Sequence, residues 1–239
     1  WRNDSYGIVS GAKAEGSASG GGTGAGGGVD VNAYANANVK TYITSGTVTS
    51  TTGNIDVISR SVNQAEGDGD GVLVGGIGIG VIFVDATANG ATNTYINNGT
   101  INADSGDVRI ESQHRGQSFA DSFAAAGGLL AGEGNTSTAT VSPQVSAYLA
   151  TPIGTSAYDR ITVLASAVVA ADADAWGIAA GLLTVGVSKS DTVASPDIKA
   201  YATGILAAKR ISVSALRSTD DMLIQSKSIG SVGGLVNIN

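Results

Sequence analysis

The sequence predicts an all-β protein, a parallel β-solenoid of about 53-residue repeats with long Gly/Ala-rich, hairpin-like arms. Three observations lead to this fold class. Identical residue types recur at one fixed spacing, Val and Ile far outnumber Leu, and tiny residues alternate with larger ones along one segment of each repeat. β-Branched side chains fit pleated strands, and a fixed period of 20–50 residues is typical of stacked architectures.

The repeat is carried by two independent residue types in one register. The repeated residues are Tyr42, Tyr95, Tyr148 and Tyr201, and also Gly22, Gly75, Gly128, Gly181 and Gly234, each set at a spacing of 53. A chain of 239 residues then holds about 4.5 copies, approximately 12–64, 65–117, 118–170, 171–223 and a partial copy 224–239. The last full copy loses three residues between Tyr201 and Ile211 and regains them before Gly234. We therefore expect residues 1–239 to form a single repeat array with no separate catalytic domain.

Each copy contains three short expected strands. In the second copy these are 93–98 (NTYINN), 100–102 (TIN) and 107–112 (DVRIES), separated by turns at Gly99 and at 105–106. Short Val/Ile strands between Asn/Gly turns are typical of one rung of a parallel β-helix.

The other half of each copy is expected to form the arm. Its alternate positions are nearly all tiny, as in Ala171, Ala173, Ala175, Gly177, Ala179 and Gly181. A period of two places these residues on one face of an extended strand, where they let another backbone approach closer than the usual ~10 Å between sheets. After the repeated Gly, Leu and Ile alternate with Gly, as if the chain turned back along the same arm. Strict alternation argues against a flexible Gly-rich linker.

Composition excludes several function classes. The chain has no Cys and one His, which rules out disulfides, thiolate chemistry and His-rich metal sites. A net charge of -7, with 13 Lys and Arg against 20 Asp and Glu, argues against a nucleic-acid partner. No apolar run reaches the ~20 residues of a spanning helix, so we expect no transmembrane segment.

One acidic row is the candidate metal site. Glu15, Asp68, Asp121 and Asp174 are 53 residues apart, on the strand face opposite the tiny residues. If each repeat advances one layer, these carboxylates lie ~4.8 Å apart and repel one another by about 1 kcal/mol in water. Either solvent screens the row, as on an exposed solubilising face, or Ca²⁺ bridges it with help from Glu66, Asp70 and Asp172. Ca²⁺ is the one cofactor that the sequence suggests.

The remaining candidates favour structural roles. A repeated Tyr most often forms an internal stack that fixes the register between rungs, although a row of rings could also bind sugars. His114 follows the third short strand, and we expect a solvated surface side chain there. Asp107, Arg109 and Arg160 cluster near the same strand, as in a polysaccharide lyase, but copies of nearly constant length leave no walled cleft.

The residues NTYINNGTINADSGDVRIES at 93–112 and their three counterparts resemble the long repeats of giant bacterial adhesins of the filamentous haemagglutinin and leukotoxin-like group. The resemblance covers the whole chain but marks an architecture rather than an activity. It implies a secreted protein at the bacterial cell surface and a solenoid stalk that mediates adhesion or cell–cell contact. It supplies no catalytic residues.

We therefore expect a non-enzymatic stalk or filament segment that is extracellular. Neither end of the sequence carries a polar cap, so we expect self-association end to end or with further repeats of a longer array. Other expected partners are a host or neighbouring-cell surface, or a polysaccharide. Two alternatives stay open, a carbohydrate-active β-helix enzyme and a repeat surface that binds Ca²⁺ or polysaccharide.

Overall fold

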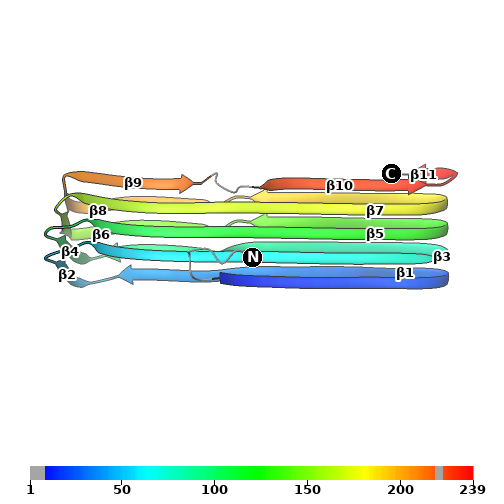
Figure 1. Ribbon diagram of the computed structural model, residues 1–239, viewed down its shortest axis with the longest axis horizontal. Helices are drawn as coiled ribbons and strands as arrows, with labels where there is room; N and C mark the ends of the chain where they lie inside the picture. The colour runs from blue at the N-terminus through cyan, green and yellow to red at the C-terminus, as the bar shows by residue number, and fades with distance from the viewer. Residues whose placement is uncertain (1–8, 219–222, 239) are drawn as a thin grey trace.

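The computed structural model describes residues 9–218 and 223–238 and shows long parallel strands stacked in layers (Figure 1). Each repeat contributes one layer. The layers contain, in chain order, β1 (Val9–Ile43), β2 (Gly46–Ser50), β3 (Ile55–Asn97), β4 (Gly99–Ala103), β5 (Val108–Val141), β6 (Gln144–Ala157), β7 (Arg160–Ala194), β8 (Asp197–Ala207), β9 (Arg210–Arg217), β10 (Ile224–Gly233) and β11 (Val236–Ile238). The predicted parallel β-solenoid is confirmed.

Every strand pairing is parallel and joins equivalent positions of neighbouring copies. β1 pairs with β3, β3 with β5 and β5 with β7, and β10 and β11 then pair with β7. We call β1, β3, β5 and β7 the first to fourth layers, and β10 with β11 the partial fifth. Tyr42 pairs with Tyr95, and Gly128 with Gly181, so the 53-residue spacing becomes one step of the stack.

The strands are much longer than the sequence indicates. The third short strand, 107–112, and the arm that follows it form one continuous strand, which begins at Val108 in the third layer. Pro143 and Pro196, which lack a backbone N–H, separate β5 from β6 and β7 from β8. The first two layers lack a proline at the equivalent positions, Ala37 and Gly90, and their strands continue through them.

The arm is hairpin-like in path but not in hydrogen bonding. Its outgoing segment, for example 118–127, and its return segment, 129–141, each pair with the equivalent segments of neighbouring layers. The two segments therefore meet through their side chains. Figure 1 shows the resulting long, flat loops, all closing on the same side of the stack.

The tiny residues line the interface between the two segments, as predicted. A Cβ placed on Gly69 would lie 2.7 Å from Val84 Cγ2, and one on Gly16 would lie 2.6 Å from Val29 Cγ1. Those distances are below van der Waals contact, so glycine is what allows the return segment to approach. The resulting core consists of small and β-branched residues, with Val31, Ile82 and Val84 among the larger ones.

The three-residue deletion of the fourth copy is absorbed at one place. The β6–β8 register shifts between Thr151 and Thr155, where β8 contains Gly204 at a φ of 102°. Ile161 then pairs with Ile211, at a spacing of 50. Ala171 pairs with Ile224, so the 53-residue register is restored before β10.

Candidate functional site

The four carboxylates of the predicted acidic row stack on one another. Glu15 pairs with Asp68, Asp68 with Asp121 and Asp121 with Asp174, all on the outer face of the outgoing segments. Asp174 then pairs with Lys227 of the fifth layer. The sequence thus identifies the row, and the structure adds that it ends on a cation.

Charge repulsion along the row is compensated at its lower end. Lys13 Nζ lies 2.9 Å from Glu15 Oε1 and 2.8 Å from Glu66 Oε1, so one ammonium pairs with a carboxylate in each of two layers. Higher in the stack, burial first and then the charges of Asp174 and Asp172 raise the pKa of Asp121 to about 6. Burial followed by Asp70 raises the pKa of Asp68 as well.

Aromatic side chains flank the carboxylates in the upper layers. A shallow depression of about 370 Å³ is lined by Asp68, Asp70, Asp121, Ser122, Phe123, Asp174 and Trp176. Lys227 Nζ lies 4.6 Å from the centre of the Trp176 ring, a cation–π contact with one of the residues that line the depression. Within residues 9–218 and 223–238, no group of three or more carboxylate or imidazole side chains is arranged to hold a metal ion. Ca²⁺ binding by the row stays a prediction.

The repeated tyrosines form a continuous stack. Successive ring centroids are 5.2, 4.8 and 4.8 Å apart, with interplanar angles of 10°, 2° and 4°. The expectation of an internal stack is wrong in position: the rings lie on the outer surface, because the inward positions on either side belong to residues such as Thr94 and Ile96. Only the edges of its middle rings reach solvent. This arrangement fixes the register, and the ring faces open to a ligand are those of the end residues, Tyr42 and Tyr201.

The repeated glycines close the arms. A Cβ on Gly128 would lie 2.0 Å from the carbonyl oxygen of Gly75, and one on Gly181 would lie 2.2 Å from that of Gly128. Each turn therefore needs glycine because the layer below leaves no room for a side chain. Gly234 occupies the corresponding bend between β10 and β11.

His114 is buried, so the expectation of a solvated surface side chain is wrong. Its exposed fraction is 2%, and its Nδ1 lies 2.7 Å from Ser61 Oγ and 3.0 Å from Thr92 Oγ1. Burial lowers the pKa of the imidazole to about 4. The strand does not end before His114, since Val108–Val141 is one strand whose alternate positions face inward. His114 is a neutral member of an internal polar stack.

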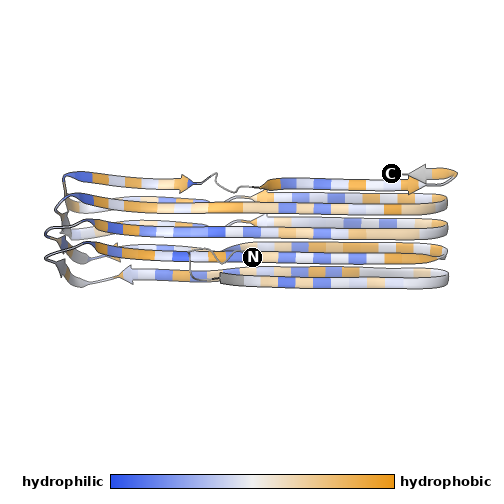
Figure 2. Ribbon diagram, in the orientation of Figure 1, coloured by the Kyte–Doolittle hydropathy of each residue, from blue (hydrophilic) through white to orange (hydrophobic). Residues whose placement is uncertain are grey.

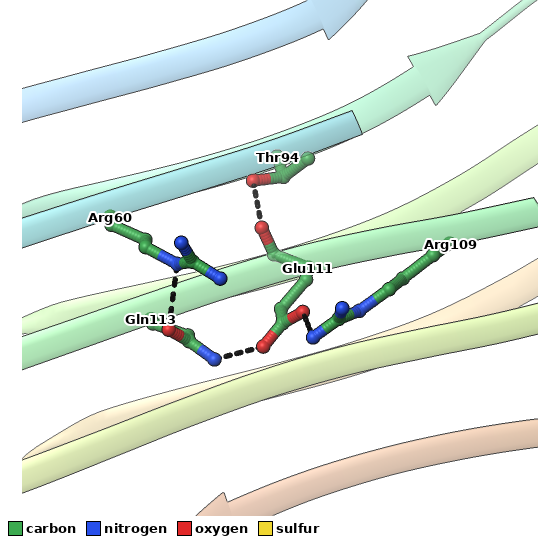
Figure 3. A network of polar contacts seen from close by, with 5 residues as sticks. All are labelled: Arg60, Thr94, Arg109, Glu111 and Gln113. Carbon is green, nitrogen blue, oxygen red and sulfur yellow. Dashed lines mark hydrogen bonds and ion pairs between the residues drawn. The ribbon is translucent and has the colours of Figure 1, made fainter. Parts of the chain in front are cut away.

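A buried ionic network lies beside the same strand and was not found from the sequence. Glu111 has a fully buried side chain that forms an ion pair with Arg109 and accepts a hydrogen bond from Gln113 Nε2 (Figure 3). Arg60 Nε donates to Gln113 Oε1 at 3.0 Å, which ties the second layer to the third. Arg109 is therefore engaged in structure. Asp107 is engaged as well, because its Oδ1 accepts from the backbone N–H of Arg160 at 3.0 Å.

Glu133 is the second buried acid that sequence reasoning missed. Its side chain lies inside the third arm with an exposed fraction of 5%, and its two carboxylate oxygens have no hydrogen-bond partner in the part of the chain that the structure describes. It fits because Gly177 faces it; a Cβ there would lie 2.1 Å from Glu133 Oε1. Burial raises the pKa of this carboxyl to about 7. The signal was available, since Gly80 and Gly186 occupy the equivalent positions in adjacent copies.

Comparison of the chain with known proteins finds no matching family model, no matching curated protein and no matching solved structure. In the described ranges, no helix is long and apolar enough to cross a membrane.

Proposed function

We propose that the chain is a non-enzymatic structural segment, part of the stalk or filament of a secreted bacterial surface adhesin that mediates adhesion or cell–cell contact. The observation that supports this proposal best is the in-register parallel pairing of every layer with the next over nearly the full length of the repeat. Such a stack extends by adding copies, and its rigidity comes from backbone hydrogen bonds that do not depend on any one side chain.

The stacked side chains support the same proposal. Tyrosine rings, arm-closing glycines and inward serines each contact their own equivalents one layer away, as Ser59 Oγ does with Ser112 Oγ at 3.2 Å. These contacts all stabilise the same regular stack, in which each layer is displaced from the previous one along a single axis. Polar groups that a catalyst would need free are engaged in structure: Arg109 pairs with Glu111 of its own strand, and His114 bonds Ser61 of the adjacent layer.

The filament proposal is tested by electron microscopy of the purified chain over a concentration series, combined with fibre diffraction. Rods that lengthen along the stacking axis, with a meridional reflection near ~4.8 Å, are the expected result. Compact monodisperse particles at every concentration would contradict it. Beads coated with the chain should also retain bacterial or host cells better than beads coated with an unrelated acidic protein.

A second candidate, a repeat surface that binds Ca²⁺ or polysaccharide, is favoured by the depression beside the acidic row. Carboxylates next to Phe123 and Trp176 provide both charge and stacking surface. Isothermal titration with Ca²⁺ and with acidic and neutral polysaccharides separates this candidate from a passive stalk. Turnover of any of these glycans would instead support the carbohydrate-active enzyme.

A further inference from the structure

The outer face of the return segments carries an apolar surface near the closed ends of the arms. Its main members are Ile77, Ile79, Val81, Leu130, Leu183, Val185 and Val187. These side chains are 37–61% exposed. Figure 2 shows apolar residues gathered toward these ends of the layers. We call this surface, over positions equivalent to 24–34 of the first layer, the return face.

The return face has a relief that alternates between layers. In the second and fourth layers its outward residues at two successive positions are Ile79 with Val81, and Val185 with Val187. In the first and third layers the equivalent residues are glycines, Gly26 with Gly28 and Gly132 with Gly134. The layers therefore form ridge and groove in turn.

The grooves are open. A Cβ placed on Gly26 or Gly134 would have no atom within 4 Å, and one on Gly132 would meet only Ile79 Cγ1 at 3.9 Å and a backbone oxygen at 4.0 Å. The packing of the chain itself therefore does not require glycine at Gly26, Gly132 or Gly134, whereas a Cβ on Gly28 would lie 3.3 Å from the carbonyl oxygen of Val81. This distinguishes them from the glycines inside the arm, where a Cβ would collide with Val or Ile.

We propose that the return face binds the return face of a second copy of this chain. The two copies are related by a two-fold axis that runs parallel to the strands, between the second and third layers. This axis places the first layer over the fourth layer of the second copy, and the second layer over the third. At these two positions every ridge then meets a groove, with Ile79 over Gly132 and Val187 over Gly28 of the other copy, whereas at the preceding outward position Ile77 lies over Leu130.

The same two-fold axis also brings opposite charges together. Asp30 and Lys189 occupy equivalent positions in the first and fourth layers, both exposed. The axis therefore places Asp30 opposite Lys189 of the second copy, and symmetry repeats the pair. Between them in the stack lie Phe83 and Thr136, which face each other in the same way. An isologous contact of this kind closes on itself as a dimer.

The area of the return face is sufficient for a weak dimer. Four layers spaced at ~4.8 Å, with 11 residues at ~3.3 Å each, give a face of roughly 600–700 Å² per copy. A standard interface buries about 800 Å² per partner, and weak encounters bury less. The apolar part, over the first seven positions, covers roughly 400 Å², which is in the range where an exposed patch marks an interaction site. A net charge of -7 disfavours an anionic lipid surface as the alternative occupant.

This association is independent of growth along the stacking axis, because it uses the flat side of the arms and not the strand edges. Sedimentation velocity over a concentration series reaching about 100 µM measures it directly. The expected species is a dimer of the 23.5 kDa chain. Two sets of variants test its geometry: one fills a groove, and the other exchanges charges across the interface.

The first variant, Gly134→Val, fills a groove that is empty in the free chain. It should abolish the dimer while leaving the melting temperature unchanged or higher, since Val favours strands. Ser19→Val is the matched control, because it adds the same side chain to an exposed position on the outgoing segment, away from the return face. It should leave the dimer intact.

The second test is a charge exchange. Asp30→Lys and Lys189→Asp should each weaken the dimer by about tenfold or more, and the double variant should restore affinity. A wild-type chain that stays monomeric, or a dimer that survives Gly134→Val, would overturn the proposal. So would single charge reversals that the double variant does not rescue, or binding to anionic vesicles in place of dimerisation.

Discussion

Replacing Glu133 by Gln should remove a specific pH dependence of stability. The carboxyl has a pKa of about 7 in the folded chain, against its usual 4.5. The folded state therefore holds the proton more tightly, and the stabilisation is present below pH 4.5 and lost as the pH rises through 7. A shift of this size corresponds to about 3 kcal/mol in total.

The assay compares urea unfolding of the wild-type chain and Glu133→Gln at pH 5 and pH 8. With these pKa values, the wild type should lose about 2.5 kcal/mol between the two pH values relative to the variant. Taking the difference cancels other titrating groups, including His114, whose pKa is shifted in the opposite sense. Thr136→Ala, which changes a non-titrating residue of the same return segment, is the control and should leave the wild-type pH dependence in place.

The reasoning fails if wild type and Glu133→Gln show the same pH dependence. That result would mean that the carboxyl finds solvent or a partner in the folded state. Hydrogen exchange of the third arm gives a second measurement, because exchange in 118–141 should accelerate with pH beyond its intrinsic rate only when Glu133 is present. Glu133→Gly, which restores the residue found in adjacent copies, should behave like the Gln variant in its pH dependence.

Three further predictions concern other parts of the stack. Tyr148→Ala removes two ring contacts and should cost about 1–3 kcal/mol beyond lost area, whereas Tyr201→Ala removes one and should cost about half as much, as measured by urea unfolding. Gly69→Val forces a side chain into the arm and should destabilise the chain by about 1–3 kcal/mol in thermal melts, whereas Gly134→Val should not; equal effects would contradict the packing. His114 has a pKa of about 4, below its usual 6.5, so its contribution is complete above pH 6.5 and lost as the pH falls toward 4; His114→Gln should flatten this acid limb of the stability curve.

The sequence reveals what repeats, and this is why the stack could be predicted. Tyr148 and Gly128 identify the register because each contacts its own equivalent one layer away, so periodicity in sequence translates directly into contact. The acidic row through Asp121 follows for the same reason. The inward face of the arms was also predictable, because alternation of tiny residues has one interpretation on a strand.

Residues that do not recur in adjacent copies could not be assigned from the sequence. Glu111, Glu133 and His114 each stand alone in their rows, where the adjacent copies have Ile, Leu, Gly, Ser or Ala. Glu111 pairs with Arg109 and Gln113 of its own strand, and the Glu133 carboxylate has no hydrogen-bond partner in the described residues, so no 53-residue spacing points to either. The length of β5 was missed for a related reason. The Ser and Gly residues that form the turn around Ser105 also occur within the arm, where the strand continues without a turn.

Inside the arms, the inward residues differ in polarity from layer to layer although the backbone pairing stays the same. In the second layer the inward residues of the return segment include Ile82 and Val84, but the equivalent residues of the third layer are Asn135 and Ser137. The donors of this polar pair are satisfied by carbonyls of the outgoing segments: Asn135 Nδ2 donates to the carbonyl of Trp176 at 2.7 Å, and Ser137 Oγ to that of Asp174 at 2.5 Å. Asn135 Oδ1 has no hydrogen-bond partner in the described residues. Because the parallel pairing fixes the layers, inward residues need only match the volume of what lies opposite. Inner and outer faces can therefore diverge from copy to copy without loss of register, which is what lets one layer present a ridge and the next a groove.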